Sequence, residues 1–167
     1  MPPPSEKTLE INYVRNYLYN QHFVWQGATL IDEGTNGWDV KLDRLVQGRS
    51  YILQFKRPYS VKQQANGTKF VFYINNNSHC DQNYLLYLLA RNLGPRNVFY
   101  AFPCIEDISE LANQRNTIIS KTKIVDINHN NFSNLGFVKH KVEITRNNQG
   151  QYSVQVFSEP KDVDFYC

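Results

Sequence analysis

Five ionisable or amide side chains alternate with apolar residues in two neighbouring stretches of this chain. Residues 36–45 read NGWDVKLDRL and residues 50–58 read SYILQFKRP. Because alternate side chains of a strand point to the same face, one face of a hairpin built from these stretches carries Asp39, Lys41, Asp43, Gln54 and Lys56. Carboxylate and amide oxygens suit a hard divalent cation, and an ammonium group suits a phosphate. Such a face brings an acid, an amide and a lysine close enough to meet one metal ion and one phosphate.

The two stretches are predicted to pair as an antiparallel hairpin. Gln47-Gly48 between them is typical of a two-residue turn, for which the numbers of paired residues sum to 95, as 47 and 48 do. Asp39 is then expected opposite Lys56, and Lys41 opposite Gln54. Opposed side chains lie within about 5.5 Å of each other. The ordinary alternative is a solvated sheet face with cross-strand ion pairs such as that of Asp39 with Lys56.

The other face of the predicted hairpin is wholly apolar. Its residues are Val40, Leu42, Tyr51, Leu53 and Phe55. Such a face can pack on a helix, so this pairing buries the apolar side chains and leaves the ionisable ones together. The second strand is expected to end at Pro58, which cannot donate a ladder hydrogen bond.

An acidic residue after a turn, followed by an acid-x-Lys pattern on the next strand, is a known active-site arrangement. Here Asp39 follows Gly37, and Gln54-Phe55-Lys56 ends the second strand. The hairpin resembles that of the PD-(D/E)XK, or restriction-endonuclease-like, nuclease superfamily. Gln54 replaces the second acid, as in a Gln-x-Lys branch that resembles the Mrr-type restriction nucleases and some archaeal junction resolvases.

The resemblance implies a metal-dependent nuclease that hydrolyses phosphodiester bonds, expected in DNA, by in-line attack of a water activated by Mg²⁺ or Mn²⁺. Asp39 would be the central metal ligand, Gln54 would offer its amide oxygen and Phe55 its backbone carbonyl, and Lys56 would hold the water or phosphate. The first core helix of the family often supplies another carboxylate, for which Glu10 is the candidate. Defence against foreign DNA and repair both suit such an enzyme. The sequence leaves the oligomeric state open, and a homodimer is one candidate because duplex-cutting relatives often dimerise.

Further side chains are candidates for contacts with the nucleic acid. They are Gln82, Lys41, Arg57, Lys62 and Lys69. Gln82 and His79 lie in the first turn of a predicted helix, where unpaired backbone N–H groups can meet a phosphate. In related nucleases a polar residue here, often Gln, orients the phosphate or the water. A plain solvated surface accounts for Gln82 equally well and for His79 better, and it is the default for the basic residues. The turn residues Asp32 and Glu33 are second choices as metal ligands.

Hydrophobic periodicity predicts the remaining elements. They are a helix over 6–21 capped by Ser5, a strand within 23–31, a polar basic loop over 59–69, a strand over 70–74, a largely buried helix from Ser78 to Leu93, a strand over 97–103, a helix over 106–116, a strand over 117–127 and a hairpin of 137–145 with 151–157. In the first helix, Glu10 falls on or beside the inward stripe.

This order predicts an α/β fold with the restriction-endonuclease-like αβββαβ core of the resembled superfamily. Such a core has a mixed central sheet flanked by helices, followed here by a C-terminal β-hairpin. Residues 1–167 are expected to form a single nuclease-like domain, with 1–4 and 158–167 flexible.

Composition indicates the cellular compartment of the protein and limits the kinds of partner and site that it can have. The net charge of +3 and pI of about 8.7 permit a polyanionic partner without demonstrating one. Three cysteines without Cys-x-x-Cys spacing argue against a disulfide framework or a zinc site and favour the cytoplasm. With no signal peptide and no apolar stretch near the ~20 residues of a membrane span, no membrane association is expected.

Other functions stay open. Because Gln54 removes a negative charge from the site, the chain could be a catalytically inactive nuclease-fold module for nucleic-acid binding or assembly. A protein-interaction domain without any nucleic-acid role predicts no salt-dependent DNA binding. The chain has no Gly-x-Ser-x-Gly, Walker or Gly-x-Gly-x-x-Gly motif, and Cys80 and Cys104 lie in apolar contexts that favour the core.

Overall fold

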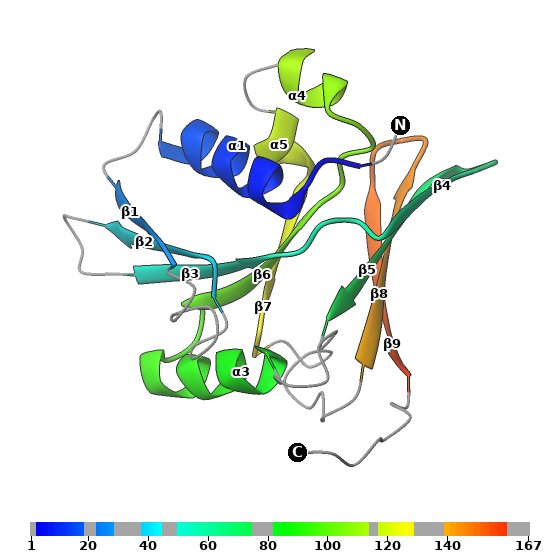
Figure 1. The fold of residues 1–167 in the computed structure, drawn as a ribbon. Coiled ribbons are helices and arrows are strands. Elements are labelled where there is room, and N and C mark those ends of the chain that lie inside the picture. The colour runs from blue at the N-terminus through cyan, green and yellow to red at the C-terminus, as the bar shows by residue number, and fades with distance from the viewer. Residues whose placement is uncertain are drawn as a thin grey trace.

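Two β-sheets and a few helices make up the described part of the chain. A computed structural model describes residues 3–18, 23–28, 38–44, 50–74, 82–113, 117–128 and 139–159. The fold is mixed α/β and mostly sheet (Figure 1). Predictions for Asp32, Glu33, Ser78, His79, Cys80 and the segment 160–167 concern residues outside these ranges.

The first sheet has five strands and is mixed. Its strand order is β1 (Phe23–Gly27), β2 (Val40–Arg44), β3 (Ser50–Phe55), β6 (Val98–Pro103) and β7 (Thr122–Asp126). β3 and β6 run parallel, and the other neighbours are antiparallel. The predicted strand over 97–103 is thereby confirmed.

Helices lie on both sides of this sheet. They are α1 (Glu6–Leu18), α3 (Gln82–Leu93), α4 (Ser109–Asn113) and α5 (Thr117–Lys121). α1 and α5 lie over one face, and α3 lies under the other (Figure 1). The predicted strand over 117–127 is wrong in its first half, because α5 precedes β7.

The α1 side of the sheet has its own buried cluster. Leu9, Tyr13 and Val14 of α1 pack against the apolar face of β2 and β3, and the Tyr13 ring lies edge-on to Phe55 with centroids 5.4 Å apart. The predicted cap of α1 is confirmed, since the Thr8 amide donates to Ser5 Oγ at 3.2 Å.

The second sheet has four antiparallel strands. Its order is β4 (Ser60–Gln64), β5 (Gly67–Ile74), β8 (Lys139–Asn147) and β9 (Tyr152–Glu159). The predicted C-terminal hairpin is confirmed as β8 and β9. The inner face of the second sheet packs against the first sheet, as in the edge-on contact of Phe72 with Phe102, whose centroids lie 5.0 Å apart.

The predicted polar loop over 59–69 is wrong. Residues 60–64 form β4, a tight turn follows, and Gly67 starts β5. Gly67 has φ 141°, and an added Cβ would lie 2.0 Å from the Arg146 carbonyl oxygen. This close approach lets β5 pair with β8, so the segment gains ladder hydrogen bonds that local sequence does not reveal.

The prediction that the helix ending at Leu93 is largely buried is also wrong. Only Asn83, Leu86 and Ala90 of α3 are buried, whereas Tyr84, Leu88 and Leu93 are 44%, 38% and 43% exposed. The second sheet shares the same face of the first sheet with α3, so α3 lies at the surface. Its predicted end is confirmed, since Gly94 has φ 85° and its amide donates to the Ala90 carbonyl at 2.9 Å. No described helix is long and apolar enough to cross a membrane.

Candidate metal and phosphate site

The hairpin of β2 and β3 positions the candidate site, in a register that differs from the predicted one. Val40 pairs with Leu53 and Lys41 with Ile52, so paired numbers sum to 93 (40 plus 53) and not to 95. The expected pairs of Asp39 with Lys56 and of Lys41 with Gln54 are therefore wrong. Because a shift of two residues keeps every side chain on its face, the apolar face still packs under α1.

The observed register places Asp39 beside the end of β3. Its Oδ2 atom accepts hydrogen bonds from Gln54 Nε2 at 2.8 Å and from the Phe55 amide at 2.7 Å. The Asp39 amide donates to the Leu53 carbonyl at 3.1 Å, and the side chain is only 8% exposed. Backbone bonds thus hold the carboxylate in place, and it lies at the mouth of the parallel pair of β3 and β6.

The side chain of Gln54 is buried, and only one of its two polar atoms forms hydrogen bonds within the described part of the chain. Its Nε2 atom also donates to the Phe55 carbonyl at 3.1 Å, so both amide hydrogens point at oxygen atoms. Its Oε1 atom has no hydrogen-bond partner within the described part of the chain, although the residue is 1% exposed. An unsatisfied buried acceptor costs about 1–3 kcal/mol. Rotating the amide by half a turn exchanges its oxygen and nitrogen at almost no change in shape.

The carboxylate of Asp39 lies in an acidic environment. Burial, then the negative charge of Glu6 and, least, that of Glu10 raise the pKa of Asp39 from its ordinary value to about 7. The positive charge of Lys56 and the hydrogen bond from the Phe55 amide oppose this rise in pKa. Buried acids with like-charged neighbours are typical of functional sites.

Glu6 is the site residue that sequence reasoning missed. An acid in the first turn of a helix is ordinarily explained by its favourable interaction with the helix dipole, yet the Glu6 Oε2 atom accepts a hydrogen bond from the Arg57 amide at 3.0 Å, next to Lys56. The spacing of Glu6 and Glu10 at i and i+4 puts them on one side of α1. That spacing is the signal by which Glu6 could have been found.

Glu10 lies where the helix periodicity predicts, on the inward side of α1. It is 4% exposed and forms an ion pair with Lys7 at 2.8 Å. Its negative charge is the smallest of the causes that raise the pKa of Asp39, so Glu10 acts on the Asp39 carboxyl group only electrostatically.

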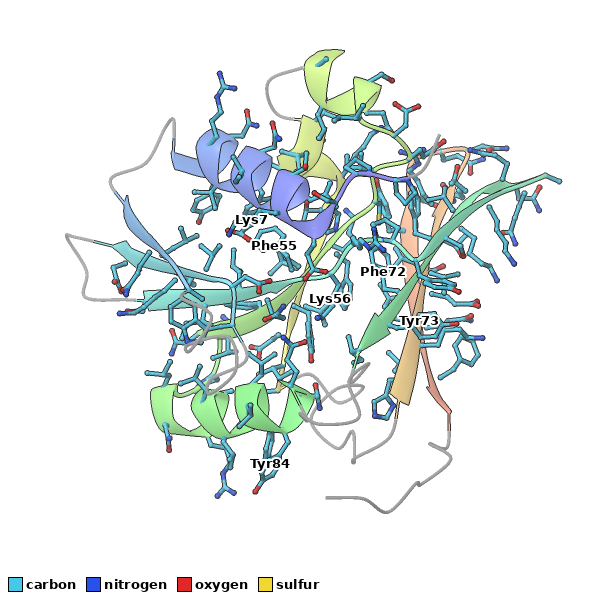
Figure 2. The ribbon with its side chains drawn as sticks, viewed as in Figure 1. Lys7, Phe55, Lys56, Phe72, Tyr73 and Tyr84 are labelled. Carbon is cyan, nitrogen blue, oxygen red and sulfur yellow. The ribbon has the colours of Figure 1, made fainter. Side chains whose placement is uncertain are left out.

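Lys56 follows directly after β3. Figure 2 shows Phe55 and Lys56 on opposite sides of the strand, with Phe55 toward α1. The Lys56 amide donates to the Ala101 carbonyl at 3.0 Å, which holds the end of β3 on β6. Within the described ranges its ammonium group forms no ion pair, so it can meet an anion from outside.

The residues expected to contact nucleic acid lie in several places. Lys41 forms a 3.1 Å ion pair with Asp43, which also accepts a hydrogen bond from Ser50 Oγ at 2.5 Å. Arg57 is exposed beside the site, and Gln82 begins α3. Lys62 and Lys69 are cross-strand neighbours in the second sheet, so they do not join the Asp39 group.

A separate hollow of about 570 Å³ lies between the β8–β9 turn and α5. Its lining includes Thr68, Lys121 and Arg146 but none of the residues around Asp39. Arg146 is paired with Glu106 at 2.5 Å, and Lys121 is paired with Glu110. Since these cations are already neutralised, the hollow is the weaker candidate for anion chemistry.

The Asp39 group suits magnesium better than zinc. No group of three or more His, Cys, Asp or Glu side chains is arranged to hold a metal ion in the part of the chain that the structure describes. Asp39 Oδ2, the Phe55 carbonyl and the orphaned Gln54 Oε1 are oxygen donors, which Mg²⁺ prefers while keeping several waters. Cys104 is confirmed in the core, and burial raises the pKa of its thiol to about 12, so it is no nucleophile.

Comparison with known proteins gives no match: no protein-family model, curated protein or solved structure matches the chain. What the site does must be inferred from its own geometry.

Proposed function

We propose that this chain is a Mg²⁺- or Mn²⁺-dependent nuclease of the PD-(D/E)XK type that hydrolyses phosphodiester bonds of DNA. The observation that carries the proposal is the Gln54 amide, which is buried against Asp39 and leaves its oxygen without a partner among the described residues. With the Gln54 amide rotated by half a turn, so that its oxygen takes the place of the nitrogen beside Asp39, a divalent cation between these groups would bind that oxygen and the ionised form of Asp39 together.

Different residues of the chain would bind the cation and the phosphate. Asp39, the Gln54 amide oxygen and the Phe55 carbonyl would hold the cation, and Glu10 and Glu6 add negative charge nearby. When bound, the cation supplies a lowered water pKa and neutralises charge that develops on the phosphate. The Lys56 ammonium group would bind a phosphate oxygen and stabilise that charge.

The order of elements supports this assignment. The chain runs from α1 through β1, β2 and β3 to α3 and β6, which agrees with an αβββαβ order when β4 and β5 are taken as an insertion after β3. β6 follows α3 and lies beside β3 in parallel, so the carboxyl ends of the two strands point toward the side of the sheet where Asp39 contacts Phe55. Ligands of open α/β sheets commonly bind at the carboxyl ends of such parallel strands.

Cleavage assays on single- and double-stranded DNA with Mg²⁺ or Mn²⁺ test the proposal. Asp39→Asn and Lys56→Ala are expected to lower the rate by about 10² or more, because each removes a group that acts on the developing charge. The matched control is Asp43→Asn, which removes another acid from the same face of β2 and should retain activity. Wild-type rates in both Asp39→Asn and Lys56→Ala would exclude this active site.

A second candidate is an inactive nuclease-fold module that binds nucleic acid. It is favoured by one observation, namely that the Gln54 amide hydrogens already satisfy Asp39 and Phe55 without a cation. Calorimetric titration with Mn²⁺ separates the two functions. Binding that is lost in Asp39→Asn supports the nuclease, whereas no Mn²⁺ binding together with intact DNA affinity supports the module.

A further inference from the structure

The second sheet has an outer face that the proposed active site does not use. Its inner face carries Phe70, Phe72, Val142 and Ile144, all fully buried. Side chains at alternate positions point the other way, and Figure 2 shows Phe72 and Tyr73 on opposite sides of β5, with Tyr73 directed away from the first sheet.

Aromatic side chains and a lysine form one row across this outer face. Tyr59, whose amide donates to the Val71 carbonyl at 2.7 Å just before β4, lies edge-on to Tyr73 with ring centroids 5.0 Å apart. Tyr73 pairs with Lys141, and Lys141 pairs with Phe157. Tyr59 is 69% exposed and Phe157 is 41% exposed. Rings at both ends of the row are therefore open to solvent.

Basic side chains lie both in this row and elsewhere on the same outer face. The Lys141 ammonium lies 4.9 Å from the centroid of the Phe157 ring, and Lys62 pairs with Lys69 across β4 and β5. Glu143 contacts Lys69 at 2.8 Å and Lys141 at 3.6 Å. Among the described side chains of this face, three lysines thus meet one carboxylate, and the face is net positive.

We infer that this outer face binds single-stranded nucleic acid. The face comprises Tyr59, Lys62, Lys69, Tyr73, Lys141 and Phe157. Exposed aromatic rings stack on unpaired bases of any sequence, and neighbouring lysines contact the phosphates between them. Bases in a duplex are already stacked on each other, so the rings select a single strand.

The charge of this face argues for nucleic acid over a protein partner. Protein interfaces are depleted in lysine at their centre, whereas Lys141 lies inside the aromatic row and not at its rim. Binding here needs neither a cation nor Asp39, so the inference goes beyond the proposed cleavage and can succeed or fail independently of it.

Fluorescence anisotropy with a labelled oligothymidine of about 12 nucleotides, within the usual site sizes, tests the inference on the full chain in EDTA. Phe157→Ser and Tyr59→Ser are each expected to weaken binding about fivefold or more, because one base–ring stack is lost. Phe157→Tyr, which keeps a ring, should restore the affinity. The control Ile124→Ser removes a side chain of similar exposure, 40%, from β7 in the first sheet and should leave binding unchanged.

Salt dependence tests the lysines. Lys141→Gln is expected to reduce the slope of log affinity against log salt by about 0.7, the value for one phosphate contact on a single strand. Asp39→Asn should bind the strand like the wild type even if it no longer cleaves DNA, which separates this inference from the nuclease proposal.

Three results would overturn the inference. They are no binding by wild type at low salt, wild-type affinity in both Phe157→Ser and Tyr59→Ser, and competition by a duplex as effective as that by the strand. Self-association that Phe157→Ser abolishes, without affinity for the oligonucleotide, would assign the face to contacts between copies of the chain. Circular dichroism confirms that each variant is folded.

Discussion

The amide nitrogen of Gln54 donates a 2.8 Å hydrogen bond to Asp39 Oδ2, so an amide and an acid from adjacent strands share one buried contact. The resembled nuclease family usually has two acids at these positions. Two buried carboxylates repel each other unless a cation lies between them. The amide lets the pair remain in contact without metal, while its oxygen stays available.

Gln54→Glu is expected to make the stability of the protein depend on magnesium. In EDTA the new carboxylate lies against the carboxylate of Asp39, so the free energy of unfolding at pH 8 should fall by about 1–3 kcal/mol. Added Mg²⁺ should recover it, with equal or higher Mg²⁺ affinity than wild type and with cleavage preserved. Urea denaturation with and without Mg²⁺ measures the effect.

Gln54→Met is the control for that experiment, because it keeps the side-chain length and removes both polar atoms. Its stability should not respond to Mg²⁺. If Gln54→Glu folds by circular dichroism yet loses both Mg²⁺ binding and cleavage, Gln54 is not a metal ligand.

Asp39 is expected to make the protein less stable as pH rises. Burial first, and Glu6 next, raise the pKa of Asp39 from 3.8 to about 7, so the folded state keeps a proton that the unfolded state releases. The stabilising contribution is therefore complete below pH 3.8 and is lost as pH rises through about 7, by at most about 4 kcal/mol. Urea denaturation in EDTA at pH 5 and pH 8 should show a smaller difference for Asp39→Asn than for wild type. Equal pH dependence in both proteins would contradict the shifted pKa.

Glu6 is expected to control the ionisation of Asp39 more strongly than Glu10 does. Its charge is the largest electrostatic cause of the raised pKa, and that of Glu10 is the smallest. Glu6→Gln should therefore move the titration midpoint of Asp39 to lower pH by more than Glu10→Gln does. Carbon-13 NMR of the Asp39 carboxyl group measures both midpoints. An equal or larger shift in Glu10→Gln would place Glu10, and not Glu6, next to the carboxylate.

Gly67→Ala is expected to disrupt the second sheet. The added Cβ would lie 2.0 Å from the Arg146 carbonyl oxygen, at a φ of 141° that suits only glycine, so unfolding free energy should fall by about 3 kcal/mol or more. Gly150→Ala is the matched control: it also has positive φ, 77°, but its Cβ would meet no atom within 4 Å. That variant should lose about 1 kcal/mol. If urea denaturation gives the same loss of unfolding free energy for both variants, the close pairing of β5 with β8 at Gly67 is ruled out.

Local sequence periodicity was sufficient for the faces of the central hairpin and for the first helix. Alternation alone puts Asp39, Gln54 and Lys56 on one side of β2 and β3, because that assignment is the same for any register shifted by two residues. The cap at Ser5 and the spacing of Leu9, Tyr13 and Val14 likewise identify α1 and turn Glu10 inward.

Only the tertiary structure decided how these elements meet. Alternation cannot distinguish a register in which the numbers of paired residues sum to 93 from one in which they sum to 95. Residues 45–49, which join the two strands, lie outside the described ranges. The contact of Asp39 with Gln54 and the proximity of Glu6 depend on that register and on how α1 packs over β3. β5 becomes a strand because it pairs with β8 about 70 residues later in the chain, and β4 in turn pairs with β5; the sheet that they form leaves α3 at the surface. Local patterns report neighbours along the chain, whereas these contacts arise when distant segments bury one another's apolar faces.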